Sequence, residues 1–297
     1  MKLIRTLLAL TLWLAGFPAQ AEPAAPEQPP LKMGFYLPAI RDANIVDLKV
    51  SLGVWTEEVG RPYGVKIYTS TYNDMRSIRR AIDQGELNFI NAPGMELAEI
   101  FKPDELRQGY ARRHAGIDEG VAIIVAANSG IQHFVDLRGK RVERINNDHL
   151  SEYFLETQCL KTSGQDCQHF LVLKESSRDI QSVYDVFFGR TDAALVSLAT
   201  LRTARELNPQ VGDRIKVILD WKAKALIFGM MTRYTDPNYR SLILKSINEA
   251  IKTPRARQIL ELFKTDYLEP IDASDLEPYR TMLAEYNLLR KKNRGRK

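Results

Sequence analysis

The chain has 297 residues, of which 44% are hydrophobic and 27% are charged, a composition that excludes wholesale disorder, a collagen-like fibre and a multispan membrane protein. The formal net charge of +5 comes from the two ends of the chain. Without Lys2, Arg5 and the six basic residues between Arg290 and Lys297, the remainder is slightly acidic. The charge therefore gives no indication of a nucleic-acid-binding face.

The first 21 residues have the layout of a secretory signal peptide. Lys2 and Arg5 form a positive n-region, residues 7–17 form a short apolar run, and Ala19-Gln20-Ala21 is an A-x-A cleavage site. A membrane anchor is disfavoured because spanning a bilayer needs about 20 apolar residues. We expect cleavage after Ala21, a Pro-rich leader over residues 22–30, and an exported mature protein in the periplasm without stable membrane insertion.

The first part of the folded chain alternates strand and helix patterns. Buried strands are predicted at residues 31–37, 65–69 and 87–90. Apolar residues at helical spacing over 45–59 and over 75–82 predict the two helices between them. This β-α-β-α-β order indicates a doubly wound, mostly parallel sheet, the first of two in an α/β protein.

The alternation then runs a second time, which indicates a second lobe of similar construction. The predicted strands lie at residues 120–127, 141–145, 170–173, 193–196 and 215–219. Two helices separate them, one over residues 150–160 and one that Ser177 caps and Gly189 ends.

The last part of the chain is predominantly helical after one extended stretch at 225–232. Asp236 is placed to cap a helix with Pro237 at its first position, and helices follow at 255–263 and 275–288. So few strands cannot form a separate α/β lobe. We therefore expect a discontinuous lobe 1 over residues 31–120 and 223–288 and a lobe 2 over 121–222. Residues 289–297 remain as a solvated basic tail, with contact to anionic lipid as the alternative.

The mature chain contains two cysteines, Cys159 and Cys167, in a protein expected to mature in an oxidising compartment. A disulfide between them is favoured. The alternative, a metal site with His169, requires a C-x7-C-x-H pattern that matches no common zinc spacing.

No catalytic motif is present, neither a G-x-S-x-G, nor an H-E-x-x-H, nor a phosphate-binding glycine loop. The histidines show no ligand spacing, and His114, beside two arginines, is expected at the surface. We expect no enzyme activity, no cofactor and no metal.

Three motifs resemble those of the phosphonate-binding family of periplasmic solute-binding proteins. S-G-I at residues 129–131, followed by D-L-R-G-K-R-V at 136–142, is similar to the family's entry into the second lobe. Residues 85–98 and 189–194 are similar to its G-x-x-D-x-x-x-x-G-P-x-x-Y-x-x-A and G-x-x-D-A-A motifs. The resemblance implies a type II periplasmic binding protein fold with a ligand cleft between two lobes.

The residues that hold the anion in that family are only partly kept. Its Ser-Thr-Ser turn falls on residues 149–151, where only Ser151 remains. Its Tyr after the third strand falls on Glu96, its His before the later helix falls on Arg178, and its Tyr after the second strand appears as Tyr72. The resemblance therefore implies the fold and does not identify the ligand.

Seven candidate ligand contacts follow, all placed at strand ends or helix starts. Tyr72 is a ligand contact or a packing residue, Ser151 a ligand donor or a helix cap, and Arg178 a clamp for an anion or a solvated first-turn residue. The remaining four are expected to shape the rim of the cleft; they are Tyr36, Asn91, Pro93 and Gly94.

The predicted function is capture of a small anionic solute, a phosphonate-like oxyanion or a carboxylate, by hinge closure of a monomer that serves an ABC transporter permease. The alternative is a ligand-sensing or scaffold component of a membrane sensor kinase with a degenerate ligand site. The loss of two hydroxyls before Ser151 favours that alternative.

Overall fold

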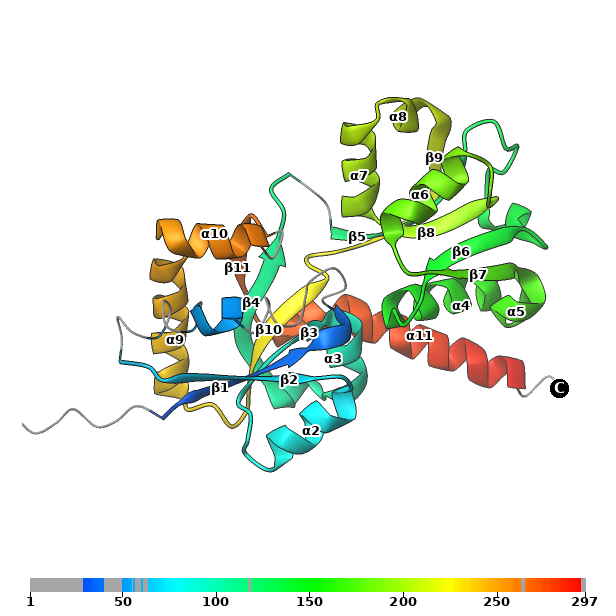
Figure 1. The fold of residues 1–297 in the computed structure, drawn as a ribbon. Helices are drawn as coiled ribbons and strands as arrows, with labels where there is room; N and C mark the ends of the chain where they lie inside the picture. Colours follow the sequence, from blue (N-terminus) through cyan, green and yellow to red (C-terminus); the bar gives the residue numbers. More distant parts are fainter. Residues whose placement is uncertain are drawn as a thin grey trace, which may run out of the picture.

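A computed structural model describes residues 29–39, 50–54, 56, 60, 64–116, 119–262 and 265–294. The predicted signal peptide and most of the predicted Pro-rich leader lie outside these ranges. So does much of the predicted helix over 45–59, although residues 50–54 and 56 are helical. Figure 1 shows two lobes, each built on one sheet with helices on both faces.

Lobe 1 contains a six-stranded sheet with the strand order β11-β4-β10-β3-β1-β2. Strand β1 pairs in parallel with β2 and β3, whereas β10 is antiparallel to β3 and β4, and β11 is antiparallel to β4. The prediction of a mostly parallel sheet is therefore wrong here, because the strands that return late in the chain enter antiparallel. The strands are β1 (Leu31–Tyr36), β2 (Ile67–Tyr72), β3 (Phe89–Pro93), β4 (Leu106–Arg113), β10 (Ile227–Thr232) and β11 (Tyr267–Ile271).

Lobe 2 contains a five-stranded sheet with the order β7-β6-β8-β5-β9. Strand β6 is parallel to β7 and β8, whereas β5 is antiparallel to β8 and β9, so this sheet is also mixed. All its strands come from one continuous stretch of chain. They are β5 (Glu119–Ala126), β6 (Arg141–Ile145), β7 (Val172–Ser176), β8 (Ala193–Ser197) and β9 (Ile215–Ala223).

Successive side chains along the strands of lobe 1 point to opposite faces of the sheet, and each face packs in a separate hydrophobic layer. Ile90 and Ala92 lie in a cluster with α2 (Met75–Asp83) and α3 (Gly94–Ile100). Met33, Phe35 and Phe89 lie in a second cluster, with α9 (Pro237–Ala250). Helix α10 (Pro254–Leu262) lies beside α9 on the same side (Figure 1).

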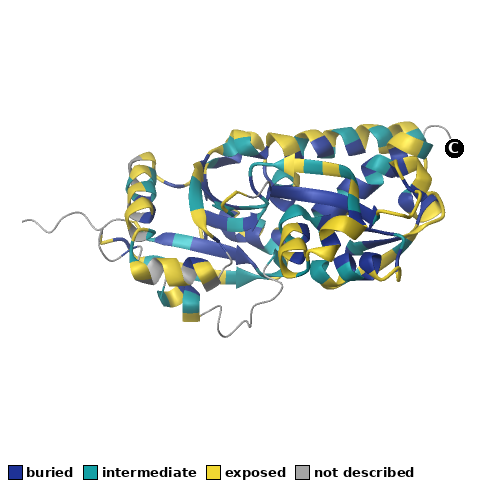
Figure 2. Ribbon diagram, turned by 90° about the horizontal axis from the view of Figure 1, so that it is seen from above, coloured by how far each residue is buried: buried dark blue, intermediate teal, exposed yellow. Residues whose placement is uncertain are grey.

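The sheet of lobe 2 is covered in the same way. The buried residues Val121 and Ile123 of β5 share a cluster with α4 (His149–Ser163) and α5 (Cys167–Phe170). Ala122 and Ile124 share another cluster with α6 (Asp179–Phe187), α7 (Leu198–Leu207) and α8 (Gln210–Arg214). Figure 2 shows the buried strands between helices whose outer faces are exposed. Short 3-10 segments complete the fold at η1 (Leu37–Ala39), η3 (Pro103–Glu105), η4 (Phe134–Leu137) and η5 (Ala273–Leu276).

The last helix, α11 (Glu277–Arg294), follows the strands of lobe 1 but extends along lobe 2 and contacts both α3 and α4 (Figure 1). The ring of Tyr286 packs edge-on against that of Tyr153 in α4, with centroids 4.9 Å apart. Lys161 of α4 forms an ion pair of 2.9 Å with Glu285. Residues 289–294 are the last turns of this helix, so the helix extends beyond its predicted end at residue 288; residues 295–297 lie outside the described ranges.

Several elements differ from the sequence-based prediction. Strands β4 and β11 and helices α3 and α7 were not predicted, and β4 in particular carries three arginines and no regular apolar alternation. The predicted capping role of Ser177 is wrong, because Arg178 is the N-cap residue of α6. The predicted stop at Gly189 is confirmed: this residue follows α6 with a φ of 70°, a conformation that favours glycine.

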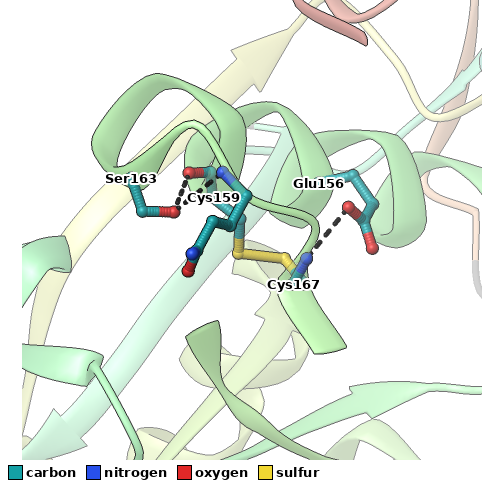
Figure 3. The surroundings of a disulfide bond; sticks show 5 residues. Glu156, Cys159, Ser163 and Cys167 are labelled. Carbon is teal, nitrogen blue, oxygen red and sulfur yellow. Dashed lines mark hydrogen bonds between the residues drawn. A yellow bond between two sulfur atoms is a disulfide. The ribbon is translucent and has the colours of Figure 1, made fainter. Parts of the chain in front are cut away.

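Cys159 and Cys167 form the predicted disulfide, which joins α4 to α5 across a Cα–Cα distance of 5.3 Å (Figure 3). The Cys167 amide donates to Glu156 at 3.1 Å, and the Ser163 hydroxyl donates to the Cys159 carbonyl at 2.9 Å. Both cysteines are buried, so the bridge fixes the short turn inside the core of lobe 2. Among the described helices, none is both long and apolar enough to cross a bilayer.

Candidate functional site

A cleft of about 250 Å³ lies between the two lobes. Lobe 1 contributes the start of α3, the end of β4 and the start of β10, while lobe 2 contributes the starts of α4, α6 and α7. Most of these are junctions between strands and helices, where backbone donors and side chains are free to face a ligand.

The floor of the cleft on the lobe 1 side is fixed by a buried tyrosine. Tyr279 of α11 donates a hydrogen bond from its hydroxyl to the Ala225 carbonyl and packs edge-on against Trp221 and Phe228, with centroids 5.0 and 5.8 Å away. A Cβ on Gly94 would lie 2.5 Å from the Tyr279 ring. Glycine at the first position of α3 therefore lets the aromatic ring close the cleft from below.

Basic side chains line the lobe 1 wall, next to a buried carboxylate at the start of the lobe 2 sheet. Arg112 and His114 lie at the end of β4, and Glu119 at the start of β5 is buried. His114 Nδ1 lies 2.7 Å from Glu119 Oε1. Burial lowers the pKa of Arg112, while the nearby Glu119 charge opposes this effect. Arg112 nevertheless remains a cation, because the ordinary pKa of arginine is far above neutrality.

The lobe 2 wall presents hydrogen-bond acceptors. Asp148 precedes α4, and the hydroxyl of the buried Ser151 donates to Asp148 Oδ2. Asp179 at the start of α6 accepts from the Ser197 amide at 3.2 Å, and the Ser197 hydroxyl donates to Thr200 Oγ1 at 2.8 Å. Both serine hydroxyls direct their proton to a neighbour on lobe 2, so a ligand meets mainly their lone pairs and two carboxylates.

The structure brings three of the seven predicted ligand contacts into this cleft, namely Pro93, Gly94 and Ser151. Asn91 lines a separate cavity on the other face of the lobe 1 sheet. Tyr36 and Tyr72 are paired neighbours at the ends of β1 and β2 and are not among the described residues that line the cleft.

Arg178 is exposed before α6 and is not among the described cleft residues either; its neighbour Asp179 lines the cleft instead. The ligand contact predicted at Arg178 thus falls on a side chain that faces solvent. The expectation of a surface position for His114 is also corrected, since this residue is half-buried in the cleft wall.

Sequence reasoning missed the charged residues of the site. Asp148 and Asp179 each lie three residues after the end of a strand, β6 or β7, next to the start of the following helix, which is the region in which α/β sheets place ligand contacts, so the pattern contained a signal for them. Arg112 lies near the end of β4, which was not predicted, and Glu119 lies at the start of β5, which was predicted. Tyr279 came from a helix far away in the sequence.

A second set of contacts joins the lobes beside the cleft. Glu99 of α3 accepts a hydrogen bond of 3.1 Å from the Tyr153 hydroxyl and pairs with His149 Nδ1 at 2.9 Å, both on α4. The hydrogen bond to Glu99 raises the pKa of His149 to about 9, and the same contact lowers the pKa of Glu99. An ion pair therefore links α3 of lobe 1 to α4 of lobe 2 at neutral pH.

Glu96 lies one helical turn before Glu99 and is buried, with its Oε2 atom unpaired among the described residues. Desolvation raises its pKa to about 7, although the nearby His149 charge opposes the shift. No group of three or more His, Cys, Asp or Glu side chains suited to a metal ion occurs in the described part of the chain.

A sequence model of one family, described as the periplasmic substrate-binding protein of ABC phosphonate transporters, matches residues 44–276. No curated protein is detectably similar in sequence.

Solved structures resemble the chain in fold. A Xanthomonas citri protein bound to ATP has a TM-score of 0.64 at 13% identity over 88% of this chain and 98% of its own. PhnD1 from Prochlorococcus marinus, in complex with methylphosphonate, has a TM-score of 0.60 at 14% identity over 86% and 98%. A binding component of a Pseudomonas aeruginosa ABC phosphonate transporter has a TM-score of 0.60 at 12% identity over 90% and 89%. These likenesses show a type II periplasmic binding protein fold.

Proposed function

The chain belongs to the periplasmic substrate-binding proteins of ABC phosphonate transporters, and we propose that it captures a small solute bearing an anionic group in the cleft between its lobes. The solute is then presented to the permease of the transporter. Capture and release of the solute involve no catalytic step and need no cofactor. The mature protein acts in the periplasm as a monomer, after cleavage of residues 1–21.

The observation that carries this proposal is the distribution of charge across the cleft. Arg112 stands on the lobe 1 wall, and a guanidinium can donate two parallel hydrogen bonds to a phosphonate or carboxylate. Asp148 and Asp179 stand on the lobe 2 wall and accept hydrogen bonds. The solute is thus oriented with its anionic group toward lobe 1 and with donor groups, such as an ammonium or hydroxyls, toward lobe 2.

Closure of the lobes around the solute is supported by the contacts between α3 and α4. The Glu99–His149 pair and the hydrogen bond from Tyr153 join the lobes next to the cleft, so opening the cleft widely requires their separation. The bound solute contacts both walls only when the lobes are closed. It therefore binds the closed form more tightly than the open form and shifts the equilibrium toward closure. The sensing or scaffold alternative receives no support from the comparisons.

The experiment compares two ligands and two variants by titration calorimetry. The ligands are a short alkylphosphonate and the aminoalkylphosphonate of equal chain length, and the second should bind more tightly because its ammonium meets Asp148 and Asp179. Arg112→Gln should weaken binding of either ligand about ten- to a hundredfold, the effect of losing a charge-assisted hydrogen bond of about 1.5–3 kcal/mol.

Arg178→Gln is the matched control, because it removes an equal charge from an exposed position outside the cleft lining. Its affinities should stay within about twofold of the unchanged protein, as expected for a screened surface charge. Equal losses in the two variants would show that Arg112 has no specific role. Absence of binding by either phosphonate would refute the proposed class of solute.

A further inference from the structure

A second cavity, of about 90 Å³, lies within lobe 1 on the face of the sheet covered by α9 and α10. Alternate residues of four neighbouring strands form its floor, because side chains at positions i and i+2 of a strand share one face. Ile247 of α9, Leu260 of α10 and Leu268 of β11 contribute to its other walls. The lining is apolar except for Asn91, Tyr110, Arg112 and Thr265.

This cavity adjoins the cleft. Three residues, Ala39, Arg112 and Ile227, line both spaces. Ala39 ends η1 just after β1, Arg112 lies near the end of β4, and Ile227 begins β10, so all three belong to the edge of the lobe 1 sheet that faces the cleft. Ala39 and Ile227 are apolar, and Ala39 is also small. Arg112 is the cation assigned above to the anionic group of the solute.

We propose that the solute is amphiphilic: its anionic group lies in the cleft at Arg112, and an apolar substituent extends past Ala39 and Ile227 into the cavity of lobe 1. This inference rests on the proposed function for the position of the anionic group. It adds a subsite for the apolar part of the solute, formed entirely by lobe 1.

The size and chemistry of the cavity define the substituent. An apolar cavity of about 150 Å³ stays dry and accepts a benzene ring, so a cavity of about 90 Å³ suits a smaller group such as a short alkyl chain. Transfer of each methylene from water into such a space increases affinity about fourfold. Apolar walls of this kind would not favour a charged or strongly hydrated substituent.

The test is a chain-length series. Binding of n-alkylphosphonates from methyl to hexyl is measured by calorimetry, and affinity should rise about fourfold per added methylene, to about sixtyfold at butyl, and then level off as the cavity fills. The same series of n-alkylcarboxylates and n-alkylammonium ions is measured in parallel, so that the effect of the chain is separated from that of the charged group.

A variant that narrows the cavity provides the second readout. Leu268 is half-buried in the edge strand β11, where added volume is more easily accommodated than in a closed core, and Leu268→Phe should cancel the gain in affinity from longer chains. Leu288→Phe makes the same change at a position of α11 that is 68% exposed, and should leave the chain-length dependence intact.

The outcomes separate the two proposals. Phosphonates that bind with the same affinity at every chain length would support the proposed function and overturn the apolar subsite. Carboxylates or ammonium ions that bind with the expected chain-length dependence, without binding of phosphonates, would support the subsite and overturn the proposed class of charged group. No binding in any series, or an equal effect of both Leu→Phe variants, would overturn the subsite.

Discussion

Glu96→Gln tests whether the buried carboxylate of Glu96, at the interface between the lobes, destabilises the protein when it is ionised. Burial of the Glu96 side chain raises its pKa from an ordinary value of 4.5 to about 7, so the folded protein binds a proton here more tightly than the unfolded chain. Stability is therefore lost as the pH rises from about 4.5 to about 7. A difference of this size corresponds to about 3 kcal/mol of unfolding free energy, because one pH unit equals about 1.4 kcal/mol.

Replacement by Gln keeps the shape of the side chain and removes the charge. We expect Glu96→Gln to raise the free energy of unfolding by up to about 3 kcal/mol at pH 8 and to change it little at pH 4, where Glu96 is protonated in both states. The assay is urea denaturation of the mature protein at pH values from 4 to 9, followed by circular dichroism.

Glu99→Gln is the matched control, one turn further along the same helix. The hydrogen bond with His149 lowers the pKa of Glu99, so its contribution to stability is present above the ordinary pKa and is lost as the pH falls. Its substitution should therefore destabilise the protein at neutral pH. An effect of Glu96→Gln that is equal at pH 5 and pH 8, or that has the same sign as that of Glu99→Gln, would refute the assignment of a buried carboxylate.

Substituting both Cys159 and Cys167 by serine should lower the free energy of unfolding by about 2–3 kcal/mol in urea denaturation, and the unchanged protein should show no titratable thiol in denaturant without reductant. The contact with Glu99 raises the pKa of His149 from its ordinary value of 6.5 to about 9, so its contribution to stability is lost as the pH rises from about 6.5 to about 9, and His149→Gln should flatten the loss of stability that denaturation curves show over that range. Cleavage after Ala21 should be visible in the intact mass of exported protein, and a retained N-terminal segment would contradict it.

The fold was largely predictable because its signals are local. Runs of apolar residues and the glycine at position 189 mark strands and helix ends within a few residues of where they occur. The sheet order was not predictable in the same way. β4 and β11 have mixed polar sequences, and what makes them strands is pairing with each other and with β10, far along the chain. Because neither strand was predicted, the antiparallel pairing of β4 with β10 and β11 was not predicted either.

The site was less predictable than the fold, since its residues meet only in three dimensions. Ser151 was chosen as the start of a predicted helix and Pro93 and Gly94 as the loop after a predicted strand, and all three line the cleft. Arg178 was chosen for its charge, but its neighbour Asp179 has the inward position. Arg112 lies on an unrecognised strand, and Tyr279 reaches the cleft from the last helix, so no local pattern could identify either of them.

The strand order of lobe 1 has a consequence for the sequence of events in folding. β10 lies between β3 and β4, yet it is synthesised only after the whole of lobe 2. Until it arrives, the facing edges of β3 and β4 lack their partner, and exposed strand edges of this kind promote association between chains. Lobe 2 has no such interruption, because its five strands follow one another along the chain. If lobe 2 completes its sheet before β10 pairs, the facing edges of β3 and β4 stay exposed in the meantime and need protection from other chains.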